Sequence, residues 1–188
     1  RTSEIDFAVL KAINPDVCAW LRAEDTVIDY PVVHGTDNEY YLKHLYTGQK
    51  NRNGSVFVDC GNTGLFTEQN TLIFGHNMQS GAMFGTLKGY KKQDYYDAHP
   101  TMTLYTPAGD YTLELIAGTV EDGAYTFAKC SFDSSEEFFD YVADLKSRST
   151  FQSSVEVQED DRLVSLCTCT YEFSNARYVV VGKLTALP

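Results

Sequence analysis

Apolar residues in this chain fall into short runs, and each run is bounded by turn-forming residues. The runs are rich in β-branched and aromatic side chains, a composition typical of strands. A pair of them flanks Pro107 to Asp110, which predicts a hairpin. The pattern predicts a mainly β protein with strands at residues 17–21, 26–30, 55–59, 71–74, 102–106, 111–117, 163–169 and 178–181.

Two segments have helical spacing instead. Residues 4–13 carry apolar side chains at helical intervals, with Ser3 as the expected N-cap and Asn14-Pro15 as the stop. The second segment begins with Ser134 and Glu137, which form a capping-box pattern, and an apolar stripe follows at Phe138, Tyr141/Val142 and Leu145. We expect this second helix to cross over the sheet and to form one wall of a binding groove.

Length and charge limit the function classes. A chain of 188 residues is long enough for one domain with a substantial core, and we expect a single domain. Its formal net charge of −11 argues against nucleic acid and against an anionic membrane surface, because both require clustered Lys and Arg. The chain has no run of 18 apolar residues, and it begins with Arg1, so we expect a membrane anchor to precede it.

Reactive side chains lie at the ends of predicted strands. Cys169 ends one strand and Arg177 opens the next, so the two can lie side by side on neighbouring strands. A thiolate is a strong nucleophile, and an adjacent fixed cation favours it and can stabilise an oxyanion. The best candidate for a base is His76, which follows the strand at residues 71–74. These residues predict acyl transfer through a cysteine nucleophile.

Plainer interpretations remain open at this point. Cys167 and Cys169 are also consistent with core residues, and Arg177 with a surface ion-pair partner. The five cysteines show no CxxC pair, and a site made of Cys167, Cys169 and His76 has poor ligand spacing, so we predict no metal site. Two other functions also fit: a cysteine peptidase that uses water as the acceptor, and a non-catalytic barrel that binds proline-containing peptides.

Several segments resemble the signature motifs of class B sortases, in the family's order from about Val17 to Leu184. The resemblance implies a closed eight-stranded β-barrel at residues 15–188, an N-terminal helix at residues 1–14 and a helix at about residues 134–147, between strands six and seven. The segments are Asp29 to Val33, Asp37 to Leu42, Gly54 to Asp59, Thr71 to Met78, His99-Pro100, Leu166 to Phe173 and Arg177 to Val180.

The resemblance also implies a reaction and its partners. Cys169 is expected to cleave an Asn-Pro-x-Thr-like sorting signal of surface proteins after Thr, with His76 as acid and base. Arg177 is expected either to donate to the oxyanion or to hold the substrate backbone. The acyl group would pass to an amine of a peptidoglycan cross-bridge, of a lipid-linked precursor or of a pilin lysine. No cofactor is implied, and the expected location is the outer face of the cell membrane. The expected substrate contacts are Asn38, Leu42, Ser147, Phe151, Cys167 and Thr168.

One position departs from the family pattern. The family has Thr-Leu-x-Thr-Cys before the nucleophile, whereas this chain has Ser165 to Cys169 with a second thiol at Cys167. Residues two apart on a strand face the same side, so alternation does not distinguish the two thiols. The motif places the nucleophile after Thr168 and therefore selects Cys169, with Cys167 lining the pocket.

Overall fold

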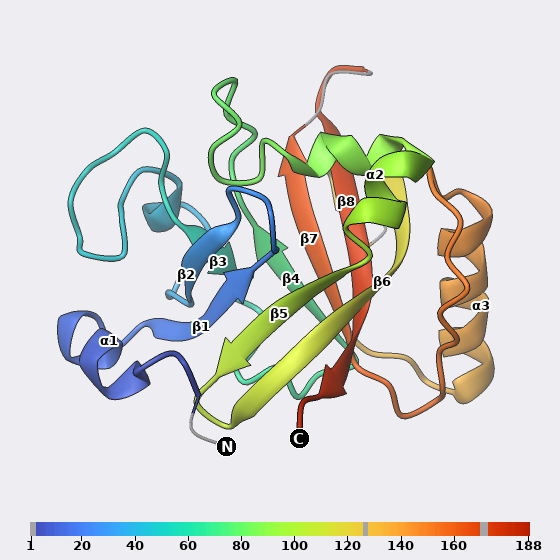
Figure 1. The fold of residues 1–188 in the computed structure, drawn as a ribbon, viewed down its shortest axis with the longest axis horizontal. Helices are drawn as coiled ribbons and strands as arrows, with labels where there is room; N and C mark the ends of the chain where they lie inside the picture. Colours follow the sequence, from blue (N-terminus) through green and yellow to red (C-terminus); the bar gives the residue numbers. More distant parts are fainter. Residues whose placement is uncertain (1–2, 126–127, 170–172) are drawn as a thin grey trace.

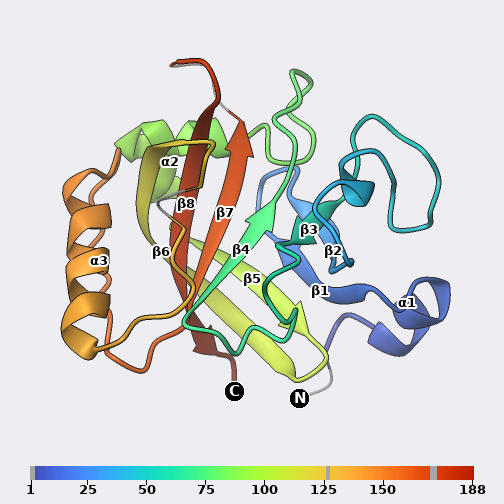
Figure 2. The ribbon, with the colours of Figure 1, turned by 180° about the vertical axis from the view of Figure 1, so that it is seen from behind.

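The computed structural model describes residues 3–125, 128–169 and 173–188, with only the backbone at residue 169. The strands of this described part close into a barrel in the order β1-β2-β3-β4-β7-β8-β6-β5 (Figures 1 and 2). The predicted eight-stranded, mainly β architecture is confirmed. The strands are β1 (Val17–Arg22), β2 (Asp29–Val33), β3 (Val56–Val58), β4 (Asn70–Phe74), β5 (Thr101–Thr106), β6 (Gly109–Asp122), β7 (Leu163–Cys169) and β8 (Ala176–Ala186).

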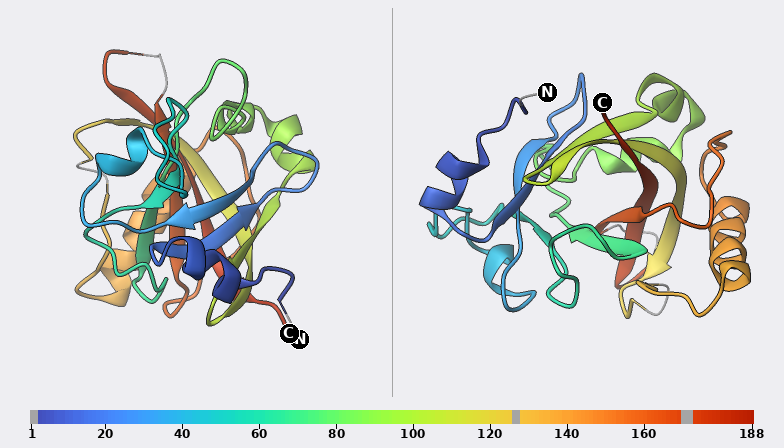
Figure 3. Two further views of the ribbon diagram at one scale, coloured as in Figure 1. Left: turned by 90° about the vertical axis from the view of Figure 1, so that its left-hand side faces the viewer. Right: turned by 90° about the horizontal axis from the view of Figure 1, so that it is seen from below.

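The helices lie outside this barrel. The longest of those described, α3 (Ser135–Ser147), follows β6 in the chain and stands against the outer face of the barrel (Figure 3). Its position between β6 and β7 confirms the predicted helix in that connection. The other helical elements are α1 (Phe7–Ile13), the 3₁₀ turns η1 (Tyr40–Leu42) and η2 (Leu87–Lys91), and α2 (Gln93–Ala98).

Strands β4 and β7 run parallel, and their C-terminal ends point the same way (Figure 2). Their register pairs Asn70 with Leu163 at one end and Phe74 with Cys167 at the other. Strand β8 is antiparallel to β7. The end of β4, the end of β7 and the start of β8 therefore meet at one edge of the barrel.

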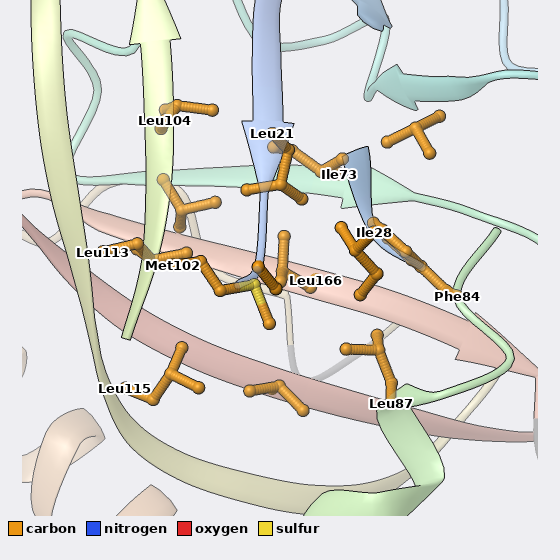
Figure 4. Packing of buried hydrophobic residues seen from close by; sticks show 14 of the residues in the cluster. Leu21, Ile28, Ile73, Phe84, Leu87, Met102, Leu104, Leu113, Leu115 and Leu166 are labelled. Atoms are coloured by element: carbon orange, nitrogen blue, oxygen red, sulfur yellow. The ribbon is translucent and has the colours of Figure 1, made fainter. Parts of the chain in front are cut away.

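The two faces of β7 pack into different clusters, because successive side chains on a strand point in opposite directions. Val164 and Leu166 belong to the apolar cluster inside the barrel. Figure 4 shows Leu166 among apolar residues from other parts of the chain. Leu163 and Cys167 belong to a second cluster on the outer side, together with Phe138 of α3. Burial on both faces explains why this strand has an almost continuous apolar sequence.

Helix α3 is specified by its cap and by its apolar stripe, as predicted. Ser134 Oγ accepts a hydrogen bond from the Glu137 N–H at 3.1 Å. Glu137 Oε2 accepts one from the Asp133 N–H at 2.6 Å, one residue earlier than in an ideal capping box. Phe138, Val142 and Leu145 are buried against the outer face of the barrel, and each contributes about 1.5–3 kcal/mol.

The predicted N-terminal helix is shorter and oriented differently. Its N-cap is Asp6, whose carboxylate accepts from the Ala8 and Val9 N–H groups, whereas Ser3 donates to Asp110. Val9 and Ile13 belong to the helical apolar pattern of residues 4–13, which predicts a buried face, yet 57% and 53% of their surfaces are exposed. Asp6 satisfies two backbone donors at once, and capping there starts the helix at Phe7, three residues later than the sequence pattern suggested.

Strand β2 lies a few residues later than predicted. The turn after β1 is closed by the Ala23 N–H, which donates to Ile28 O at 2.8 Å, so pairing begins at Asp29. Pro31 therefore lies inside β2, opposite Trp20 of β1. On the other side of β2, the pairing with β3 covers Val32 and Val33, beyond the proline. Strand β3 therefore needs no hydrogen bond from Pro31, which has no backbone N–H.

Replacing Ser134 with Ala should lower the free energy of unfolding by about 1 kcal/mol, because the Glu137 N–H loses its acceptor. Urea unfolding measures this loss. Ser134→Asp is the control, since Asp is an equally good N-cap and should stay within about 0.5 kcal/mol of the parent. Equal stability of the Ala variant and the parent would show that this cap contributes nothing.

Candidate functional site

The end of β4 is attached to the end of β7 beyond the last strand pair. The Gly75 N–H donates to Cys167 O at 3.2 Å, and Thr168 Oγ donates to Gly75 O at 2.7 Å. A side chain at Gly75 would meet the ring of Phe84 at 2.6 Å, so this close approach requires glycine. The loop that begins with His76 is therefore held beside the last residues of β7.

The His76 ring is oriented by a backbone carbonyl. Its Nε2 lies 2.7 Å from Leu42 O at the end of η1, and because a carbonyl can only accept, Nε2–H is the donor. Nδ1 is then the ring nitrogen able to exchange a proton. The backbone of His76 is fixed as well, since its carbonyl accepts from the Phe84 N–H at 2.9 Å. A strand-end histidine held in this way can serve as a proton carrier.

Arg177 is the second residue of β8 and is held by an aromatic residue. Its Nε donates to the Tyr125 hydroxyl at 3.0 Å, and Cζ lies 5.7 Å from the centre of that ring. The Tyr125 ring in turn packs edge-on against Phe74, with centroids 5.4 Å apart. Tyr125 has a left-handed backbone, with φ at 56°, which is uncommon for a non-glycine residue. The guanidinium is thus clamped at the end of β4.

Residue 169 is the register partner of Arg177 across β7 and β8. The expected placement of Cys169 and Arg177 side by side is present in the backbone. The side chain of Cys169 and the motif residues Thr170 to Glu172 lie outside the described residues.

A pocket of about 230 Å³ opens where these elements meet. It contains His76 and Arg177, and it also contains four of the expected substrate contacts. Asn38 is fixed at its rim, because its side chain donates to Asp59 Oδ1 at 2.7 Å and accepts from the Cys60 N–H at 2.8 Å. The lining residues are Asn38, Leu42, Phe57, Phe74, Gly75, His76, Tyr125, Cys167, Thr168 and Arg177.

Two expected substrate contacts lie elsewhere. Phe151 is 1% exposed and stacks on the ring of Tyr96 in the barrel core, with centroids 4.3 Å apart. Ser147 is the last residue of α3, and its hydroxyl donates to Asp144 O at 2.7 Å. Neither residue lines the pocket, so the structure gives no support to them as substrate contacts.

Comparison with known proteins shows which family has this arrangement. The sortase domain matches residues 21–185, which is most of the chain. The chain belongs to the sortase family. Sortase B of Listeria monocytogenes is 38% identical over 177 residues, which cover 93% of this chain and 72% of that protein.

Solved structures agree with this assignment. Clostridium perfringens sortase B has a TM-score of 0.89 at 36% identity, covering 96% of this chain and all of that one. A Staphylococcus aureus sortase B–substrate complex has a TM-score of 0.91 at 28% identity, covering 97% of this chain and 85% of that one. This sortase is therefore of class B and is a cysteine transpeptidase, and its family acts at the surface of Gram-positive cells.

The Cys167 thiol of this sortase is buried and unreactive. Cys167 is 1% exposed, and burial raises the pKa of its thiol well above the usual value, with nearby Asp59 acting in the same direction. The thiol therefore stays protonated and is a poor nucleophile at neutral pH. Its Sγ points to Ser165 O at 3.7 Å. Cys167 is a neutral, apolar part of the pocket, a distinction that strand alternation alone does not provide.

Three aromatic residues of the sortase pocket were not singled out from the sequence. Phe57 and Phe74 lie in predicted strands, and their ring centroids are 5.4 Å apart. Phe74 is the last residue of β4 and Phe57 is one residue from the end of β3, positions that could have marked them as pocket residues. Tyr125 lies in a connection without periodicity, and no sequence pattern distinguishes it.

Two further observations concern ligands and membranes. Within residues 3–125, 128–168 and 173–188, no group of three or more His, Cys, Asp or Glu side chains could hold a metal ion. Among the helices that the structure describes, none combines the length and apolar character needed to span a bilayer.

Thr168→Val should lower kcat/KM for peptide transfer about tenfold, because the loss of the bond to Gly75 O lets the loop that begins with His76 shift. The free energy of unfolding should also fall by about 1–3 kcal/mol, since a partly buried carbonyl loses its donor. Steady-state kinetics and denaturant unfolding measure the two effects.

Thr168→Ser keeps the hydroxyl and is the matched control, with kcat/KM expected within about threefold of the parent. If the Val variant retains full activity, the Thr168 hydroxyl does not position His76.

Proposed function

We propose that this sortase cleaves a sorting signal near the C-terminus of surface proteins through a thioacyl-enzyme at Cys169, and then transfers the acyl group to a cell-wall amine. The observation that carries the proposal is the meeting of three strand ends around one pocket. His76 follows β4, residue 169 ends β7 and Arg177 opens β8. Positions 167 and 169 share one side of β7, and Cys167 already lines the pocket.

In the first half-reaction, the Cys169 thiolate attacks the carbonyl carbon of the Thr residue in the signal. The carbonyl oxygen becomes an oxyanion, and the Arg177 guanidinium stabilises it by donating hydrogen bonds. When the carbon–nitrogen bond breaks, protonated His76 gives its proton to the leaving amine. The acyl group remains on sulfur as a thioester, and the C-terminal fragment departs.

In the second half-reaction, neutral His76 takes a proton from the incoming amine, which attacks the thioester carbonyl. Collapse of the tetrahedral intermediate forms the new amide bond and releases the Cys169 thiolate. His76 is then protonated again, so the enzyme returns to its starting state. His76 exchanges a proton with both the leaving amine and the incoming amine, so the two amines bind at the same position one after the other.

For the donor, we propose an Asn-Pro-x-Thr-like signal bound in extended form. Asn38, Leu42, Cys167 and Thr168 line the pocket and are our candidate contacts. The rings of Phe57, Phe74 and Tyr125 add an apolar surface on which a proline can pack. The S. aureus sortase B–substrate complex is a similar structure and supports a peptide donor.

For the acceptor, we propose an amine of a peptidoglycan cross-bridge or its lipid-linked precursor, with a pilin lysine as the alternative. A sortase B solved in complex with triglycine, 29% identical to this chain with a TM-score of 0.88, supports an amine nucleophile. We place the enzyme on the outer face of the cell membrane, held by an N-terminal anchor outside this sequence. Screening a sorting-signal peptide library, with mass detection of the cleaved bond and of the product formed with an added amine, tests donor, acceptor and hydrolysis together.

Cys169→Ala should abolish both cleavage and transfer, a loss of at least roughly 1,000-fold in kcat/KM, because no thioacyl-enzyme can form. Cys167→Ala is the matched control two residues away. It should retain most activity, since the Cys167 thiol is buried and neutral. Mass spectrometry of the trapped thioacyl-enzyme and turnover of a sorting-signal peptide are the measurements, and comparable losses in the two variants would contradict these roles.

Arg177→Lys should lower kcat about 100-fold with little change in KM, because an ammonium cannot reproduce the planar donors of a guanidinium. The Tyr125 hydroxyl would also lose its Nε–H donor. Pre-steady-state acylation separates this effect from substrate binding. A near-normal acylation rate would show that Arg177 is only a packing residue.

A further inference from the structure

A second hollow lies next to the pocket, and we call it the basic groove. It is lined by Lys43, His44, Lys50 and Arg52, and it shares Leu42 and His76 with the pocket. The two hollows therefore adjoin at Leu42 and His76, which are in contact through Leu42 O and His76 Nε2. The groove belongs to the loop between η1 and β3, which projects to the left in Figure 1.

The charge of this groove is opposite to that of the protein. The chain carries a formal charge of −11, yet no Asp or Glu occurs from residue 40 to residue 58. Lys43, Lys50 and Arg52 are exposed, and within the described residues none of them forms an ion pair. Three like charges around one hollow repel one another, and an anion bound among them removes that repulsion.

The loop that carries these cations is ordered by its own hydrogen bonds. Its arms meet at a bridge between His44 and Lys50, and the Asn51 N–H donates to Lys43 O at 2.9 Å. His44 is fixed further, because its ring stacks on Tyr40 with centroids 3.9 Å apart and its carbonyl accepts from Ser55 Oγ at 2.8 Å. The cations are thus presented from a fixed backbone, which lowers the entropic cost of binding a ligand.

The position of the groove indicates which reactant uses it. In the proposed mechanism, His76 protonates the leaving amine and deprotonates the incoming amine, so a hollow that adjoins His76 lies on the amine side of the bond. Tight binding of the leaving fragment would slow its release. Binding of an anionic acceptor would instead raise its concentration next to a thioester on a protein that otherwise repels it.

We infer that the basic groove binds a phosphate or carboxylate group of the incoming acceptor and so selects amines that carry a nearby negative charge. This inference rests on the proposed function. Arg52 supplies a planar set of donors for two anionic oxygens, and Lys43 and Lys50 act as point charges.

Anion binding is tested first, without catalysis, using inorganic pyrophosphate as the probe. Amide NMR shifts of the 15N-labelled protein should change at residues 43–52 and saturate. They should not saturate in the triple variant Lys43→Gln/Lys50→Gln/Arg52→Gln. This measurement remains interpretable even if the proposed reaction fails.

Transfer is tested with acceptors that share one amine: triglycine amide, triglycyl-Asp amide and triglycyl-phosphoserine amide. In the triple variant, the rates with the two anionic acceptors should fall about tenfold relative to the rate with the neutral acceptor. A fall restricted to phosphoserine or to Asp identifies phosphate or carboxylate as the ligand. Acylation is measured in parallel by release of the leaving peptide, so a defect in the first half-reaction is recognised.

The variant Lys11→Gln/Lys88→Gln/Lys92→Gln is the matched control, because it removes the same number of charges from exposed lysines outside the groove. It should retain both pyrophosphate binding and acceptor preference. Absence of saturable shifts in the parent, or equal losses in the two triple variants, overturns the inference. Failure of Cys169-dependent acylation with intact pyrophosphate binding overturns the proposed function instead and leaves an anion site.

Discussion

The parallel pairing of β4 and β7 is the constraint on which the rest of the site depends. Parallel neighbours end at the same edge of a sheet, so His76, which follows β4, and residue 169, which ends β7, lie at one edge of the barrel although 93 positions separate them in the chain. The pairing continues past the strands through Gly75, which bonds to Cys167 and Thr168. Strand β8 then adds Arg177 by simple antiparallel register. The other strands complete the barrel that holds these three in place.

The sequence predicts well those features that depend on local chemistry or on the family motif. The cap at Ser134 and the stripe of α3 are examples, because a serine cap and a one-sided apolar face leave few alternatives. The start of α1 and the bounds of β2 are predicted poorly. Asp6 and Ser3 are both acceptable caps, and Ser3 bonds instead to Asp110, a tertiary partner that no local pattern reveals. Phe151 is a similar case, since its burial among aromatic rings follows from packing.

The pocket residues also divide into those that the sequence motifs identify and those that only the fold identifies. His76 and Arg177 stand out as polar residues at strand ends, but Tyr125 holds the guanidinium from a segment with no readable pattern. The state of the Cys167 thiol also depends on the fold. Strand alternation places positions 167 and 169 on the same side of β7. Burial under α3 is what keeps the Cys167 thiol neutral. A sequence can therefore identify side chains that are capable of a given reaction, and their surroundings in the fold determine which of them react.

The two ends of the chain meet at one hairpin. Ser3 donates a hydrogen bond to Asp110, and the Leu187 N–H donates to Asp110 O, at the turn between β5 and β6. Strand β8 has Arg177 near its start and Ala186 at its end, a span of roughly 30 Å. A tether joined to the first residue would thus attach at the base of the barrel. The mouth of the pocket would then face away from the anchoring surface. An enzyme oriented in this manner would meet its substrates at a distance from that surface set by the height of the barrel.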